Sequence, residues 1–167
     1  MIIGLQLAAF AWGVSVTYGQ RPVYVALVSR TLSVVAANNV DQRALTDVSL
    51  RSTGWGGPRL VYVTWQRESS DMAAATADAA RTGRNVAFRA DKYQALSAHL
   101  DRLADSAIDM RVHARAYPEL QPALERFFAA HGGTLDDYHF LGIEGRTKLG
   151  LVAMNPRDGT VVAMLHE

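Results

Sequence analysis

The residues that could support catalysis or metal binding are few and scattered. The five histidines form no close pair of the kind that a metal site uses; they are His99, His113, His131, His139 and His166. The run 136–139, Asp-Asp-Tyr-His, could hold a metal or an acid–base pair. After Thr134, however, the same residues are typical of a helix N-cap followed by a loop that enters a strand, and we favour the loop. We therefore expect no catalytic residue, no metal and no cofactor.

Sequence motifs for nucleotide binding, zinc-dependent hydrolysis and serine hydrolysis are missing from the chain. The glycine-rich run 54–57 is followed by Pro58-Arg59 and a predicted strand. A phosphate cradle needs a helix N-terminus at that point. We interpret these glycines as turn residues, and the chain as a protein that is not an enzyme.

Length, charge and the lack of cysteine limit the class of protein. A chain of 167 residues is typical of one domain with its own core. The formal net charge is +1, with 20% charged residues, so no long-range field indicates nucleic acid as a partner. Because the chain has no cysteine, disulfides and thiolate metal sites are excluded.

The first twenty residues, 1–20, predict a transmembrane helix. They contain no Asp, Glu, Lys, Arg or His, and twenty helical residues reach about 30 Å, the thickness of a bilayer's hydrocarbon core. Arg21 and Pro22 then end the helix, since arginine is tolerated at an interface and proline disfavours helix in the residue before it. Tyr18 and Tyr24 stand where such a helix would reach the headgroups. The predicted membrane-exit residues are Tyr18, Arg21, Pro22 and Tyr24.

Two other interpretations of this segment compete with the transmembrane helix. A cleaved signal peptide is disfavoured, because no basic residue precedes the apolar run and no small-x-small site ends it. A buried core helix of a soluble protein remains open, because alanines and glycines lower the mean hydropathy of the run. Arg21 and Arg30 alone would place the following domain in the cytoplasm.

The remaining chain, 21–167, alternates between strand and helix patterns. Strands are expected at 23–28, 32–36, 59–65, 148–154 and 160–165, the last two joined by a turn at 155–159. Helices are expected within 41–50, over 71–82 after Ser70, over the stripe from Tyr93 to Ala107, and from Pro118 to the glycines at 132–133. Hairpins rather than regular βαβ units predict an α+β domain with a mostly antiparallel sheet.

The helices around Leu100 and Leu124 should cover one face of that sheet. Leu96, Leu100 and Leu103 are expected in the core. Trp55, Phe127 and Phe128 are candidate partner-binding residues, although aromatic residues at helical spacing are more often buried.

Several segments resemble the TfpX/TfpZ family of type IV pilin accessory proteins. The resemblance is carried by Leu5-Gln6-Leu7, Arg21-Pro22-Val23-Tyr24 and Val34-Val35-Ala36 within the stretch 5–41, with weaker matches at Gly57-Pro58-Arg59, Tyr93 and Asp158-Gly159. Family members have more membrane helix upstream, so the chain resembles an N-terminally truncated form. Where the family has Asp-Arg-Phe between its first two strands, this chain has Ser29-Arg30-Thr31-Leu32.

The resemblance implies a bacterial inner-membrane protein whose C-terminal domain lies in the periplasm. It would bind a specific type IV pilin and modulate its assembly or stability without catalysis, in the manner of a chaperone. The resemblance leaves the oligomeric state open. The alternatives are a membrane-anchored sensory or ligand-binding domain, which needs a polar pocket, and an enzyme built around Asp136, Asp137 and a histidine.

Overall fold

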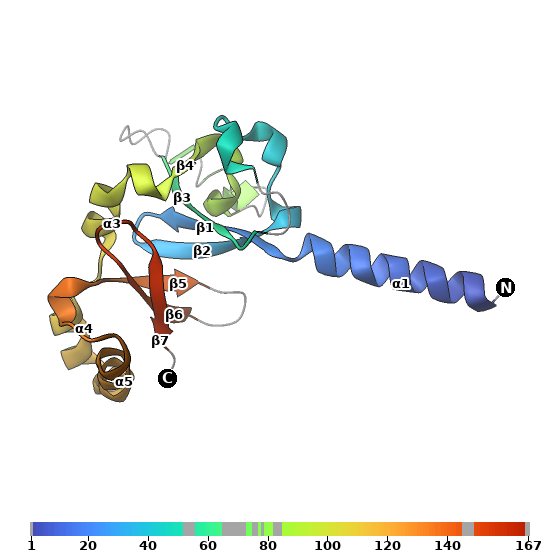
Figure 1. The fold of residues 1–167 in the computed structure, drawn as a ribbon. Coiled ribbons are helices and arrows are strands. Elements are labelled where there is room, and N and C mark those ends of the chain that lie inside the picture. Colours follow the sequence, from blue (N-terminus) through green and yellow to red (C-terminus); the bar gives the residue numbers. More distant parts are fainter. Residues whose placement is uncertain are drawn as a thin grey trace.

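The computed structural model describes residues 2–51, 56–64, 73–74, 77, 79–81, 85–144 and 149–165. These residues form one α+β domain around a curled sheet, from which a single helix, α1, projects (Figure 1). The sheet contains seven strands in the order β4-β3-β1-β2-β5-β6-β7 within the described part of the chain. The strands are β1 Pro22–Val28, β2 Thr31–Ala36, β3 Arg59–Val63, β4 Tyr93–Ala95, β5 His139–Glu144, β6 Leu149–Met154 and β7 Val161–Leu165.

Apart from α1, the α-helices whose bounds the structure describes are short. The α-helices are α1 Ile2–Gly19, α3 Leu100–Ser106, α4 Met110–Ala116 and α5 Gln121–His131. Short 3₁₀ helices connect the remaining elements: η1 Ala37–Asn39, η2 Gln42–Ala44, η3 Val48–Leu50, η4 Val86–Phe88, η5 Ala90–Lys92, η6 Leu96–Ala98, η7 Pro118–Leu120 and η8 Leu135–Asp137.

The pairing of the strands is mixed, with antiparallel neighbours in the majority. Strands β1 and β2 form the expected hairpin, and β5, β6 and β7 form a meander. Strand β3 runs parallel to β1, and β5 runs parallel to β2. The two parallel pairs are joined by long connections, which let the chain return to the starting end of the sheet before the next strand begins. The expected mostly antiparallel α+β sheet is confirmed.

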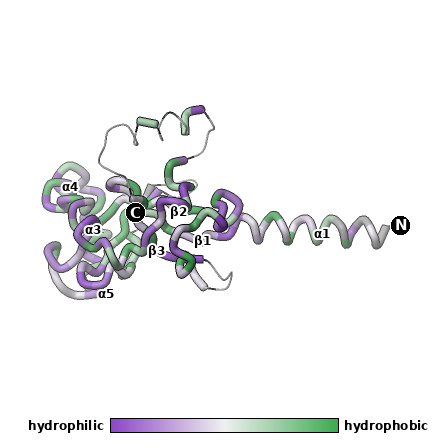
Figure 2. Tube along the Cα trace, turned by 90° about the horizontal axis from the view of Figure 1, so that it is seen from above, coloured by the Kyte–Doolittle hydropathy of each residue, from purple (hydrophilic) through white to green (hydrophobic). Residues whose placement is uncertain are grey.

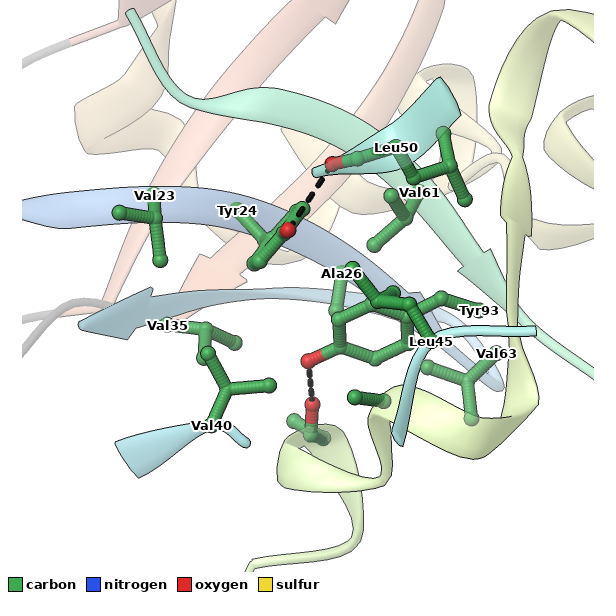
Figure 3. Close-up of a cluster of buried hydrophobic side chains, with 12 residues drawn as sticks. Val23, Tyr24, Ala26, Val35, Val40, Leu45, Leu50, Val61, Val63 and Tyr93 are labelled. Carbon is green, nitrogen blue, oxygen red and sulfur yellow. Dashed lines mark hydrogen bonds between the residues drawn. The ribbon is translucent and has the colours of Figure 1, made fainter. Parts of the chain in front are cut away.

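Alternation along the strands places three core clusters on the two faces of the sheet. On β1, Tyr24 and Ala26 point into the first cluster and Val25 and Leu27 into the second, so these clusters lie on opposite faces. The short 3₁₀ helices η3, η4 and η5 contribute to the first cluster (Figure 3), and α3 covers the second. The third cluster packs α4 and α5 against β5, β6 and β7, where Phe140 and Leu151 point to the face opposite Leu141 and Val152 of the second cluster. The prediction that the helices around Leu100 and Leu124 cover the same face of the sheet is therefore wrong.

The prediction of one long amphipathic helix from Tyr93 to Ala107 is wrong. The segment forms β4, then η6, then α3, with His99 in a non-helical conformation between the last two. Tyr93 is buried in the first cluster and Leu96 in the second, on opposite faces of the sheet. A single helical face could not reach both. The predicted burial of Leu96 and Leu103 is nevertheless confirmed, and Leu100 packs half-buried beside them.

Three other expected helices have different outcomes. The segment 41–50 forms two separate 3₁₀ turns, capped by Asp41 and Asp47, instead of one helix. Of the helix expected over 71–82, residues 73–74, 77 and 79–81 are described and are helical, and the other residues lie outside the described part of the chain. The helix after Pro118 is confirmed, since η7 continues into α5 and α5 ends at Gly132, whose φ is 71°.

Helix α4 was not expected from the sequence. It begins where the Asp109 carboxylate accepts hydrogen bonds from the backbone N–H groups of Arg111 and Val112. Its one buried residue is Met110. An N-cap followed by only seven helical residues gives too short an apolar pattern to recognise.

Candidate functional site: the end of helix α1 and a polar recess

Helix α1 stands apart from the domain. Figures 1 and 2 show it extending away from the sheet, and its C-terminal end contacts η1. Its large apolar side chains are exposed; they are Leu7, Phe10, Trp12, Val14, Val16 and Tyr18. The predicted helix over 1–20 is thus present and unpacked. Across the described residues, no helix has both the length and the apolar character required to cross a bilayer.

Arg21 folds back onto the last turn of α1. Its guanidinium lies 3.6 Å from the centroid of the Tyr18 ring, a cation–π geometry. Its Nη1 also donates a hydrogen bond of 2.8 Å to the Tyr18 carbonyl, which accepts a longer one of 3.4 Å from the Arg21 backbone N–H. Pro22 follows at once as the first residue of β1. The two side-chain interactions of Arg21 with Tyr18 fix the point at which the helix gives way to the sheet.

Tyr24 has a different place from the one expected. It is fully buried in the first cluster, where its hydroxyl donates a hydrogen bond of 2.9 Å to the Leu50 carbonyl (Figure 3). Its ring meets Tyr93 edge-on at 5.1 Å. Tyr24 therefore cannot contact lipid headgroups in this fold. Both faces of β1 are covered by the rest of the domain, so each residue from Val23 to Leu27 is buried, Tyr24 among them.

Of the aromatic residues proposed as partner anchors, Phe127 is a core residue. Phe127 is 5% exposed and packs edge-on against Phe128, Tyr138 and Phe140 in the third cluster. The prediction of Phe127 as a partner-binding residue is wrong, because α5 turns that side of the helix towards the sheet. Phe128 is half-buried at the edge of the cluster. Trp55 lies outside the described residues.

The acidic run at 136–139 is a structural cap. The Asp137 carboxylate accepts hydrogen bonds from the backbone N–H and the hydroxyl of Thr134, at 2.7 and 2.9 Å. These bonds lower the pKa of Asp137. Asp136 pairs with Arg111, and partial burial lowers the pKa of His139. In the described part of the chain, no three acidic or histidine side chains gather in a way that could hold a metal ion.

A polar recess lies beside the end of α1. It has a volume of about 440 Å³ and is bounded by β2, η1, η4 and the end of β5. Four carboxamides line it, namely those of Gln20, Asn38, Asn39 and Asn85, together with the Ser33 hydroxyl and the Glu144 carboxylate. Sequence reasoning identified Asn38-Asn39 only as the end of a strand. Since its other residues come from distant segments, no local pattern could have indicated the recess.

Comparison of the chain with protein-family models, with curated proteins and with solved structures finds no significant match.

Proposed function

We propose that the protein is an accessory factor of type IV pilus biogenesis. It would be held in the bacterial inner membrane through α1, with the α+β domain in the periplasm. There it would bind one type IV pilin and change the assembly or persistence of that pilin without catalysing a reaction.

The observation that carries this proposal is an uncharged helix whose described large apolar side chains are exposed rather than packed against the domain. Its side chains at Phe10, Trp12 and Val14 are between 52% and 73% exposed. A helix with so much exposed apolar surface is expected to bury it against lipid or another helix. At about 1.5 Å per residue, 18 residues reach about 27 Å, so a bilayer could accommodate α1 by local thinning.

The resemblance to the TfpX/TfpZ family supplies the partner in this proposal. A pilin held in the same membrane would meet α1 at a raised effective concentration, because both proteins are confined to one layer. Contact between helices in the membrane then needs only close packing and few polar interactions. The small residues Ala9, Gly13 and Thr17 recur every fourth position along α1 and would permit such an approach.

A deletion strain tests this function. We expect loss of the gene to lower surface piliation or pilin abundance, and plasmid-borne wild-type protein to restore it. The Val14→Asp variant should restore it poorly, because a charge at the middle of a membrane helix costs about 3 kcal/mol.

The matched control is Val48→Asp, which places the same charge on the domain at a valine that is 59% exposed, against 52% for Val14. Piliation and pilin abundance are measured together with the distribution of each variant between membrane and soluble fractions. Unchanged piliation and pilin abundance in the deletion strain, with the pilin gene expressed, would overturn the proposal.

A membrane-anchored ligand-binding domain is the second candidate, and the polar recess is the observation that favours it. Convergent polar groups around a hollow are what such a domain requires.

A further inference from the structure

The polar recess at the end of α1 has the chemistry of a site for a small cation. Among the described residues that line it, the one charged side chain is Glu144. The carboxamide oxygens of Asn38 and Asn39 can accept hydrogen bonds, and that of Asn85, which already accepts one from the Ala87 backbone N–H at 2.9 Å, has a second lone pair. The Ser33 hydroxyl is a further acceptor, and the register of β2 with β5 places Ser33 opposite Glu144. Acceptors of several kinds thus converge on one hollow.

Glu144 is available to a ligand. It is exposed, and within the described part of the chain no ion pair joins it to an arginine, lysine or histidine. An anionic ligand would meet this carboxylate without a compensating cation in the described lining. The described lining therefore favours a ligand that carries a positive group over one whose only charge is negative.

The kind of cation follows from the shape and composition of the lining. A primary ammonium carries three N–H donors, which match a carboxylate, a hydroxyl and carboxamide oxygens. A quaternary ammonium has no donor and is bound by cages of several aromatic rings. The described lining holds a single aromatic residue, Phe88, so it fits the primary ammonium better.

The position of the recess indicates where such a group would come from. Gln20 and Pro22, which flank the helix exit at Arg21, form part of its wall, and the Cβ of Asn38 lies 3.7 Å from a Cβ built on Gly19. If α1 lies in a bilayer, as the proposed function has it, the recess stands at the level of the lipid headgroups. Phosphatidylethanolamine presents a primary ammonium at that level.

We propose that this recess binds a primary ammonium group, and that the headgroup of phosphatidylethanolamine supplies it. Glu144 pairs with the ammonium, while the Ser33 hydroxyl and the carboxamide oxygens of Asn38, Asn39 and Asn85 accept the remaining hydrogen bonds. The lipid source rests on the proposed membrane location of α1, whereas the recognition of the ammonium group does not.

The first arm of the test uses soluble headgroups with the full chain in detergent micelles. Glycerophosphoethanolamine should produce saturable NMR shifts in the side-chain amides of Asn38, Asn39 and Asn85, and glycerophosphocholine should not. Glu144→Gln should weaken the binding about tenfold or more, as expected for loss of a charge-assisted hydrogen bond.

Two further variants make the result specific. Glu119→Gln makes the same change at an exposed glutamate of η7, away from the recess, and should leave binding unchanged. Asn39→Asp adds a second carboxylate to the lining and should tighten the binding. Equal shifts with the choline compound, or no shift with either compound, would overturn the proposal.

The second arm identifies the source of the ammonium. Vesicles of phosphatidylcholine, with and without phosphatidylethanolamine, are compared for binding of the full chain by flotation. A gain with phosphatidylethanolamine that Glu144→Gln abolishes supports the lipid as the ligand. Soluble binding without any gain on vesicles would overturn the lipid assignment and leave a free primary amine as the ligand. Neither arm contains a pilin, so failure here is distinguishable from failure of the proposed function.

Discussion

Two tyrosines show how single residues hold the first cluster together. Tyr24 and Tyr93 meet edge-on, and each hydroxyl donates a hydrogen bond to a backbone carbonyl of a 3₁₀ helix, Leu50 in η3 and Ala87 in η4 (Figure 3). Each ring thus fills the core while its polar end satisfies an irregular connection. The segments that cover this part of the sheet are short 3₁₀ helices rather than long α-helices. The two hydrogen bonds hold these segments against the sheet.

Burial, and secondarily the neighbouring Tyr24, raises the pKa of the Tyr93 phenol well above its ordinary value of about 10. Below pH 10 the phenol is neutral in the folded and the unfolded chain. As the pH rises above 10, the unfolded chain loses this proton while the folded chain keeps it, so the free energy of unfolding falls.

We expect the free energy of unfolding to decrease steadily above about pH 10 in the wild type, and less steeply in Tyr93→Phe. Urea unfolding followed by circular dichroism at a series of pH values measures this slope. Tyr117→Phe, at an exposed tyrosine, is the control and should keep the wild-type slope. An identical slope in wild type and Tyr93→Phe would show that Tyr93 ionises normally.

The final hairpin illustrates how one element depends on a distant one. Gly159, in the turn between β6 and β7, has a φ of 69°, and a Cβ at this position would stand 3.0 Å from the Leu100 side chain of α3. The turn thus packs against α3. Both its left-handed backbone conformation and its close contact with Leu100 favour glycine at this position.

Gly159→Ala should lower the free energy of unfolding by about 1–2 kcal/mol, mainly through the cost of a left-handed conformation in alanine. Chemical denaturation measures the loss. Gly56→Ala is the matched control, since a Cβ there would have nothing within 4 Å, and it should change stability little. Equal stability of Gly159→Ala and wild type would mean that the turn readily moves away from Leu100.

The elements with local signals were predictable from the sequence, and those determined by distant contacts were not. Strand alternation and the Asn155–Gly159 turn predicted the two hairpins, and Pro118 with the stripe at Leu124 and Phe127 predicted α5. His99 interrupts the helical pattern because Tyr93 and Leu103 pack on opposite faces of the sheet. The parallel pairing of β3 with β1 likewise depends on contacts between segments that are distant in the sequence. A helical spacing from Tyr93 to Leu103 carries no information on either arrangement.

At the scale of the whole molecule, the protein consists of a folded domain and a projecting apolar helix. The buried apolar residues of the domain lie in three clusters, whereas the large apolar side chains described along α1 are exposed. The sequence predicted this division from the absence of charge before Arg21. The recess could not be predicted, because β2, η1, η4 and β5 meet there only after folding.

In the proposed function, α1 is the segment that contacts the pilin. Site-specific photocrosslinking in cells tests this contact directly, with a photoreactive amino acid introduced at Val14 of α1 or, for comparison, at Val48 of the domain. Both valines are exposed to a similar extent, so differences in yield report the surroundings of each position. The adducts are recovered from the membrane fraction and identified by mass spectrometry. The account predicts a type IV pilin in the Val14 adduct, at higher yield than at Val48. A Val14 adduct without pilin, in cells with normal pilin levels, would contradict it.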